Sequence, residues 1–371
     1  MSFKKVLVLM HPELDYLAES VLVGLYETPE LEVIEYPYCF HMHGGIDDWY
    51  VQDNRQPGFT APAGYMADVP LPPNEKSLEE ILDRFREIDL FILSSGRSYA
   101  IRGLQEICKR LNKKPDDLNL IFCDGEDSPD INIEAISHYR PKVYFKRELL
   151  APHVKPTFTK IKAGDFWTPI FALPFSAFTR GLPEINDQEK DWDVFLALGM
   201  TWPARQTLLA KFLEAGAPRS YICVNGDNPL RWEHPFGNRL RDMMGWTEYM
   251  TKMGCSKLTA VMRGWGRDTL HAYEAFCYET LVLWCDPGIR VPFPFIPNQH
   301  CIEFTEDCED VKRLIRYYLD PAHEAERLQI AKAGKAHLYK YHTTQKRAEY
   351  MLSVSERILN GEEVDWEEFG L

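Results

Sequence analysis

The sequence lacks any apolar run long enough to span a membrane, and it lacks an excess of positive charge. A spanning helix needs about 20 mostly apolar residues. The short apolar run that follows the N-terminal lysines ends at His11-Pro12-Glu13, so it favours a buried strand over a signal peptide. The formal net charge is −14, whereas nucleic-acid binding usually depends on a basic balance. We therefore expect that the chain has no membrane span and that it is not a general nucleic-acid-binding protein.

Several signature motifs are also missing. The sequence contains no P-loop, no G-x-S-x-G nucleophile turn, no zinc-finger spacing and no C-x-x-C pair. Its nine cysteines are odd in number and irregularly spaced, and several stand in apolar runs, as Cys123 does. This pattern predicts buried free thiols in a reducing compartment, and hence a cytoplasmic protein.

What the sequence does contain is a repeated alternation of short apolar runs and helical periodicity. A chain of 371 residues exceeds what one core usually supports, which favours two domains. The alternation predicts βαβ units and parallel sheets, an α/β fold. We expect a first domain at 1–175, a proline-containing linker at 176–190, a second domain at 191–345 and a C-terminal helix at 346–371. A return of that helix onto the first domain is left open.

Histidines in a long irregular segment, 37–74, form one candidate site. Loops of this length within a compact domain are often functional. His41 and His43 have the H-x-H spacing that can hold a metal ion on a strand. A metal site, a histidine that contacts the acceptor and a purely structural role all stay open for this pair.

Polar side chains follow several predicted strands of the first half, where ligands of parallel sheets bind. His11 comes directly after the first strand and is a candidate general base. Asp124 and Glu126 stand in the densest carboxylate cluster, 124–127, and are candidates for a general base or for contacts to acceptor hydroxyls. A Mg²⁺ site or a solvated loop are the alternatives there. Lys146 and Arg147 follow another strand. Their side chains either face the cleft or form ion pairs at the surface.

The most informative segment, 263–286, reads as a strand, a glycine-containing turn and a helix. Gly264 and Gly266 allow the backbone to approach a ligand closely, and the helix start near Thr269 offers free N–H groups to a diphosphate. Glu274 stands one turn into that helix. From these residues alone, an ordinary turn and a solvated glutamate remain equally open.

An ordered set of short motifs extends this pattern over about residues 190–355. The motifs are Lys190–Phe195 with Gly199 and Arg205, Gly264–Thr269, Tyr273–Phe276, Thr280–Trp284, Tyr317–Pro321, Ala333–Lys335 and Tyr341–Thr343. Together they resemble the last domain of group-1 glycosyltransferases, particularly the spore-maturation (CgeB-like) branch.

The resemblance implies a GT-B fold, in which two Rossmann-like domains face a cleft, and the transfer of a sugar from a nucleotide-diphosphate donor to an acceptor hydroxyl. It also implies that no metal and no cofactor is needed. Glu274 matches the second glutamate of the family's E-x7-E motif, which accepts hydrogen bonds from the nucleotide ribose. The first glutamate is replaced by Gly266. Asp268 is either a substitute for it or the N-cap of the following helix.

The same resemblance implies that basic and hydroxyl side chains hold the donor phosphates. The candidates are Thr201, Arg205, Arg263 and Arg267. Three classes of acceptor stay open: a glycan, a small molecule and modified DNA. The sequence also leaves open whether the stereochemistry at the sugar is retained or inverted. There are two rival interpretations of the same fold. One is an epimerase that acts on sugar nucleotides, and the other is a protein that descends from a glycosyltransferase but has lost the activity and only binds.

Overall fold

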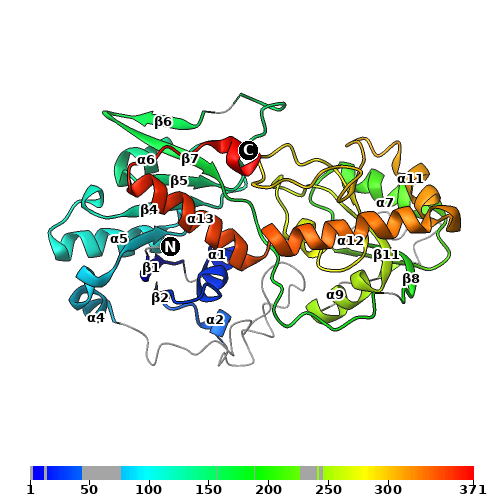
Figure 1. Ribbon diagram of the computed structural model, residues 1–371, viewed down its shortest axis with the longest axis horizontal. Coiled ribbons are helices and arrows are strands. Elements are labelled where there is room, and N and C mark those ends of the chain that lie inside the picture. The colour runs from blue at the N-terminus through cyan, green and yellow to red at the C-terminus, as the bar shows by residue number, and fades with distance from the viewer. Residues whose placement is uncertain are drawn as a thin grey trace.

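The structure, a computed structural model, describes residues 3–11, 15–43, 77–156, 158–187, 189–225, 240–241 and 245–371. It has two lobes that lie side by side, each a β-sheet covered by helices (Figure 1). The histidine-containing segment described above lies outside these residues from position 44 onward. Among the described helices, none combines the length and the apolar composition that crossing a membrane requires.

The first sheet has the strand order β2-β1-β3-β4-β5-β7-β6, and all its neighbouring strands are parallel except β6 and β7. Its interior strand β1 is buried from Val6 to Leu9, as expected for a parallel sheet covered on both faces. The strands are β1 (Lys5–Leu9), β2 (Glu32–Tyr36), β3 (Leu90–Leu93), β4 (Leu120–Asp124), β5 (Val143–Lys146), β6 (Lys160–Ala163) and β7 (Phe166–Ala172). The helices are α1 (Tyr16–Tyr26), α2 (Phe40–His43), α4 (Leu78–Asp83), α5 (Ser98–Leu111) and α6 (Ile133–Tyr139), with 3-10 turns at Phe85–Glu87 and Pro115–Asp117.

The β6–β7 hairpin lies between 151 and 190, a stretch with several prolines and no helical pattern in the sequence. Pro169 lies within β7, opposite Lys160 in the antiparallel pair. The pairing of β7 with β5 begins one residue later, at Ile170. A proline is tolerated at this point because its missing N–H is not needed by the parallel ladder.

The second sheet has the order β10-β9-β8-β11-β12-β13, with every pair parallel. In chain order this is 3-2-1-4-5-6, the Rossmann arrangement, so the strand order reverses between β8 and β11. The strands are β8 (Trp192–Gly199), β9 (Ser220–Asn225), β10 (Leu240–Arg241), β11 (Ser256–Val261), β12 (Leu281–Trp284) and β13 (Ile302–Glu303). The helices are α7 (Ala204–Ala215), α9 (Trp246–Gly254), α10 (Leu270–Glu274), α11 (Val311–Leu319), α12 (Glu324–Tyr341) and α13 (Thr344–Leu359), with 3-10 turns at Pro321–His323 and Trp366–Phe369.

The last helices connect the two lobes. Helix α12 runs along the second lobe, and α13 lies on the first lobe against α1 (Figure 1). A side chain at Gly24 of α1 would approach the carbonyl oxygen of Thr344 to 2.1 Å, so only glycine permits this packing. The Thr344 hydroxyl also donates to the carboxylate of Glu27.

The predicted α/β class with two parallel sheets and a helical C-terminus is thus confirmed. The domain boundaries given above stay a prediction.

Candidate functional site

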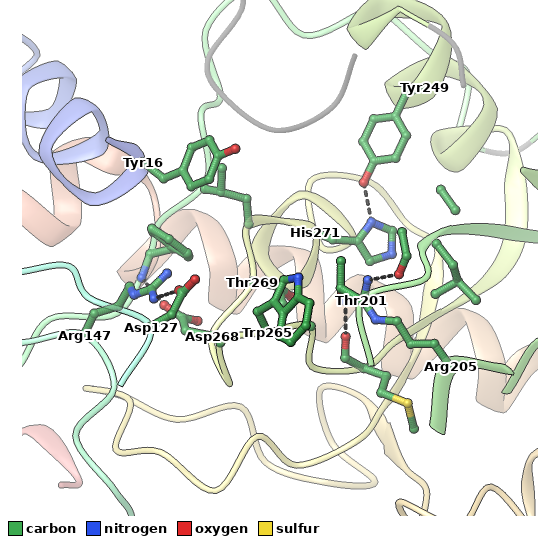
Figure 2. A pocket seen from close by; sticks show the side chains of 18 of the residues that line it. Tyr16, Asp127, Arg147, Thr201, Arg205, Tyr249, Trp265, Asp268, Thr269 and His271 are labelled. Carbon is green, nitrogen blue, oxygen red and sulfur yellow. Dashed lines mark hydrogen bonds and ion pairs between the residues drawn. The ribbon is translucent and has the colours of Figure 1, made fainter. Parts of the chain in front are cut away.

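A cavity of about 460 Å³ lies between the two lobes. In the second sheet it opens at the carboxyl ends of β8 and β11, the strands between which the order reverses, where ligands of such sheets bind. Gly199 ends β8 and Met262 follows β11. The first lobe contributes Asp127, which follows β4, and Arg147, which follows β5. Strand ends of both sheets therefore bound the cavity (Figure 2).

Arg205, in the first turn of α7, lines the cavity and holds these strand ends together. Its Nη1 donates to Gly199 O at 2.7 Å, its Nη2 to Met262 O at 2.8 Å and its Nε to Arg263 O at 2.8 Å. No carboxylate of the described residues pairs with it, and burial lowers the pKa of Arg205 to about 10. A buried positive charge thus stands beside the cavity, with three of its five N–H groups already bound to backbone.

Thr201 and Gly264 lie next to Arg205. A side chain at Gly264 would come within 3.1 Å of Thr201 Oγ1 and 3.2 Å of Arg205 Nη2. The glycine therefore lets the turn after β11 lie directly on the arginine. Thr269, at the N-cap of α10, also lines the cavity, and its side chain makes no capping hydrogen bond.

Arg263 and Arg267, which were predicted to bind the donor phosphates, are not among the described lining residues of the cavity. The Arg263 guanidinium stacks on Trp202, 4.0 Å from the ring centre. Arg267 Nη1 donates to Pro287 O at 2.9 Å. Of the four predicted phosphate-binding residues, the structure brings only Thr201 and Arg205 to the cavity.

Gly266 occupies the position at which the resemblance expects a glutamate. A Cβ atom there would lie 2.6 Å from Asp127 Oδ1 and 2.7 Å from Glu148 Oε1, two carboxylates of the first lobe. Glu148 also accepts hydrogen bonds from the backbone N–H groups of Arg267 and Asp268, at 2.8–3.0 Å. A side chain at position 266 would therefore displace the carboxylates of Asp127 and Glu148, because the first lobe packs against this turn.

Asp268 is part of the same contact between the lobes. Its Oδ2 accepts from Phe175 N at 2.6 Å. Burial raises the pKa of Asp268 to about 7, against the opposing effect of the nearby Arg147. The alternative that Asp268 caps the following helix is wrong, because Thr269 is the N-cap of α10.

Glu274 lies behind the wall of the cavity. Its side chain is buried, with 5% of the residue exposed, so the solvated alternative is wrong. Tyr249 OH donates to Glu274 Oε2 at 2.9 Å and also contacts His271 Nδ1. Burial raises the pKa of Glu274 to about 7 and lowers that of His271 to about 4. Tyr249 and His271 line the cavity directly, so they separate Glu274 from it.

Asp124 forms a buried network instead of lining the cavity. It is the register partner of Lys146 on the neighbouring strand, and Lys146 Nζ lies 3.0 Å from Asp124 Oδ2. The Tyr144 hydroxyl donates to the same carboxylate. The geometry therefore gives Asp124 and Lys146 a structural position at the end of the first sheet.

Glu126 and His11 are also not among the described lining residues. Glu126 is exposed, and its neighbour Asp127 is the carboxylate of this cluster that reaches the cavity. His11 is buried and meets Tyr99 edge-on, with ring centres 5.6 Å apart.

The H-x-H pair is only partly described. His43 is buried and its Nε2 lies 2.5 Å from Glu35 Oε1, while the side chain of His41 lies outside the described residues. No group of three or more potential metal ligands occurs among the residues that the structure describes.

Tyr16, Tyr249, Asp127 and Trp265 are among the lining residues that were not predicted as site residues. Two of them carried a signal, since Trp265 stands between two glycines and Asp127 belongs to the 124–127 cluster. Tyr16 and Tyr249 are aromatic residues on predicted helices, where a core position is the usual interpretation.

Comparisons with known proteins agree with this geometry. Residues 270–353 match a family described as glycosyl transferase-like. A glycosyltransferase from Rickettsia africae aligns with 12% identity and a TM-score of 0.58, covering 98% of this chain and 100% of the other. Anabaena HepE, solved in complex with UDP-glucose, aligns with 12% identity and a TM-score of 0.54, covering 95% and 99%.

Sucrose-phosphate synthase from Thermosynechococcus elongatus aligns with 12% identity and a TM-score of 0.52, covering 96% and 99%. No curated protein matches the sequence. The predicted two-domain architecture is confirmed: the chain has the GT-B fold, and its C-terminal segment matches a glycosyl transferase-like family.

Proposed function

We propose that this protein is a glycosyltransferase that moves a sugar from a nucleoside-diphosphate donor to an acceptor hydroxyl. The observation that carries the proposal is the Arg205 guanidinium, a buried cation without a carboxylate partner among the described residues, beside a cavity at the reversal point of the second sheet. An anionic diphosphate suits this position because it supplies the missing negative charge. The match of residues 270–353 and the UDP-glucose complex of HepE support the same donor class.

In this reaction the acceptor oxygen attacks C1 of the donor sugar and the bond between C1 and the diphosphate oxygen breaks. The acceptor hydroxyl loses its proton, and the nucleoside diphosphate leaves with the bonding electrons. Arg205 stabilises the negative charge that develops on the diphosphate. We assign Thr201, Gly264 and Thr269 to the donor, with Glu274 held close to it through Tyr249.

The finer assignment to the spore-maturation branch rests on the ordered motifs between 190 and 355. We further propose that the protein works in the cytoplasm and needs no cofactor, with the sugar nucleotide as its donor substrate. The nine cysteines, all free in the structure, suit a reducing compartment.

A nucleoside diphosphate is expected to raise the melting temperature. A ligand that binds only the folded state adds about 2.7 kcal/mol of stability when its concentration is about 100 times Kd. Differential scanning fluorimetry with UDP, GDP, ADP, CDP and TDP measures the shift, with the matching nucleosides as controls. The absence of a shift with all five diphosphates at millimolar concentration would count against the proposed function.

Transferase activity is expected to persist in EDTA. Arg205 supplies a fixed positive charge for the leaving diphosphate, so a divalent cation is not needed for that purpose. Initial rates are compared after dialysis against EDTA and after addition of Mg²⁺ or Mn²⁺. Activity that disappears in EDTA and returns with the metal would contradict this expectation and would make Asp127, the carboxylate of residues 124–127 that reaches the cavity, the candidate metal ligand.

A further inference from the structure

Trp265 is the most prominent apolar side chain at the cavity. It is 73% exposed, although a tryptophan usually buries much of its ring. Figure 2 shows its ring between two groups of the cavity wall, with Asp127 and Arg147 on one side and Thr201 and Arg205 on the other. An exposed aromatic ring at the cavity is available to stack on a ligand.

The turn that carries Trp265 is fixed on both sides. Gly264 lies against Arg205, and Gly266 lies against the carboxylates of Asp127 and Glu148. Glu148 additionally holds the backbone N–H groups that follow the turn. The backbone of residues 264–268 is therefore anchored to both lobes, and the indole projects into the cavity from a rigid support.

Asp127 supplies a polar group beside this ring. Its side chain is 60% exposed, and its partner among the described residues is Arg147. The Arg147 guanidinium is itself fixed, since it lies 4.5 Å from the ring centre of Phe175. A carboxylate held in this way accepts hydrogen bonds from neighbouring hydroxyls, while an indole face covers apolar C–H groups.

A pyranose ring presents both surfaces, hydroxyls around its edge and C–H groups on its face. We propose that the acceptor is a carbohydrate whose ring stacks on Trp265 and whose hydroxyls donate to Asp127. This inference rests on the proposed function and adds the acceptor class to it. Nucleic acid fits less well, because its phosphates would approach Asp127 on a chain of net charge −14.

Saturation-transfer NMR tests the inference by direct binding. The probes are methyl glucopyranoside, methyl galactopyranoside and methyl N-acetylglucosaminide, each titrated in the presence of UDP. We expect at least one of them to receive saturation on its ring C–H protons. Trp265→Ala should weaken its binding about ten-fold or more, and Trp265→Phe should weaken it less, because a smaller aromatic face remains. Asp127→Asn should also weaken it.

Trp167→Ala is the matched control. Trp167 is 59% exposed on β7 and is not among the described lining residues of the cavity, so its replacement should leave sugar binding unchanged. The thermal shift produced by the nucleoside diphosphate should be the same in all of these variants and in the wild type.

The possible failures are distinguishable. If no methyl glycoside binds, or if Trp265→Ala binds it as tightly as the wild type, the carbohydrate subsite is wrong while the nucleotide shift still supports the donor site. If Trp265→Ala abolishes the nucleotide shift as well, Trp265 belongs to the donor and the acceptor assignment is overturned. A wild-type protein that shows no nucleotide shift contradicts the proposed function itself.

Discussion

Replacing Arg205 by alanine is expected to lower the free energy of unfolding by about 3 kcal/mol or more. The substitution removes three charge-assisted hydrogen bonds to the carbonyls of Gly199, Met262 and Arg263 at the ends of β8 and β11. Each buried carbonyl that loses its donor costs about 1–3 kcal/mol. Chemical denaturation followed by circular dichroism measures the change.

Two further variants show whether this effect comes from the geometry of the guanidinium. Arg205→Lys keeps the positive charge but not the planar set of donors. We therefore expect its free energy of unfolding to lie between those of the wild type and Arg205→Ala. Arg219→Ala removes a half-exposed arginine that pairs with Asp193, and should cost less than about 1 kcal/mol. If Arg205→Ala were as stable as Arg219→Ala, Arg205 would not hold the strand ends together.

Glu274→Ala is expected to lower the affinity for the sugar nucleotide about ten-fold or more. Glu274 fixes the hydroxyl of Tyr249, which lines the cavity, and the loss of a hydrogen bond to a charged group costs about 1.5–3 kcal/mol, whereas 1.4 kcal/mol corresponds to a factor of ten in Kd. Isothermal titration calorimetry measures Kd. Tyr249→Phe decides how Glu274 acts: it should match the effect of Glu274→Ala if Tyr249 transmits the contact, and have a smaller effect if Glu274 reaches the ribose itself. An unchanged Kd in Glu274→Ala would remove Glu274 from the site.

The pH dependence of Glu274 provides a second measurement. Burial raises its pKa from 4.5 to about 7, so the folded state holds this proton more tightly than the unfolded state. The resulting stability is present below pH 4.5 and is lost as the pH rises through 7. The affinity for the nucleotide should change in the opposite direction, because the ionised carboxylate is the better acceptor. Both slopes should become smaller in Glu274→Gln, and part of the stability slope should remain because the pKa of Asp268 is also raised to about 7. Equal slopes in this variant and the wild type would assign them to other groups.

The two α/β lobes follow from local patterns in the sequence. Apolar strands such as 118–123 and 258–262 alternate with helices, and hydrophobic periodicity depends only on neighbouring residues. Helix α13 (Thr344–Leu359) begins two residues before the predicted start at 346, because Thr343 caps its first turn through the N–H of Lys346. The β6–β7 hairpin was missed because a proline inside a strand gives the local signal of a break.

The cavity-lining carboxylate could not be chosen from the sequence. Asp124, Glu126 and Asp127 stand in one short cluster, and all three end the same strand or follow it. The pairing of β4 with β5 places Asp124 opposite Lys146 and buries it there, while Asp127, three residues later, reaches the cavity. Register between strands is set by the packing of the whole sheet, which no local pattern specifies.

The sequence by itself determined the α/β class and the glycine-containing turn before α10, and the family resemblance implied that Thr201 and Arg205 bind the donor. Only the tertiary structure decided that these two residues lie beside the turn, that Glu274 lies behind Tyr249 and that a side chain at position 266 would displace two carboxylates. The reason is distance along the chain. Glu148 and Asp268 are 120 residues apart, and their contact depends on how the two lobes pack against each other. That packing arises from the summed burial and charge of both surfaces, so it cannot be inferred from either segment alone.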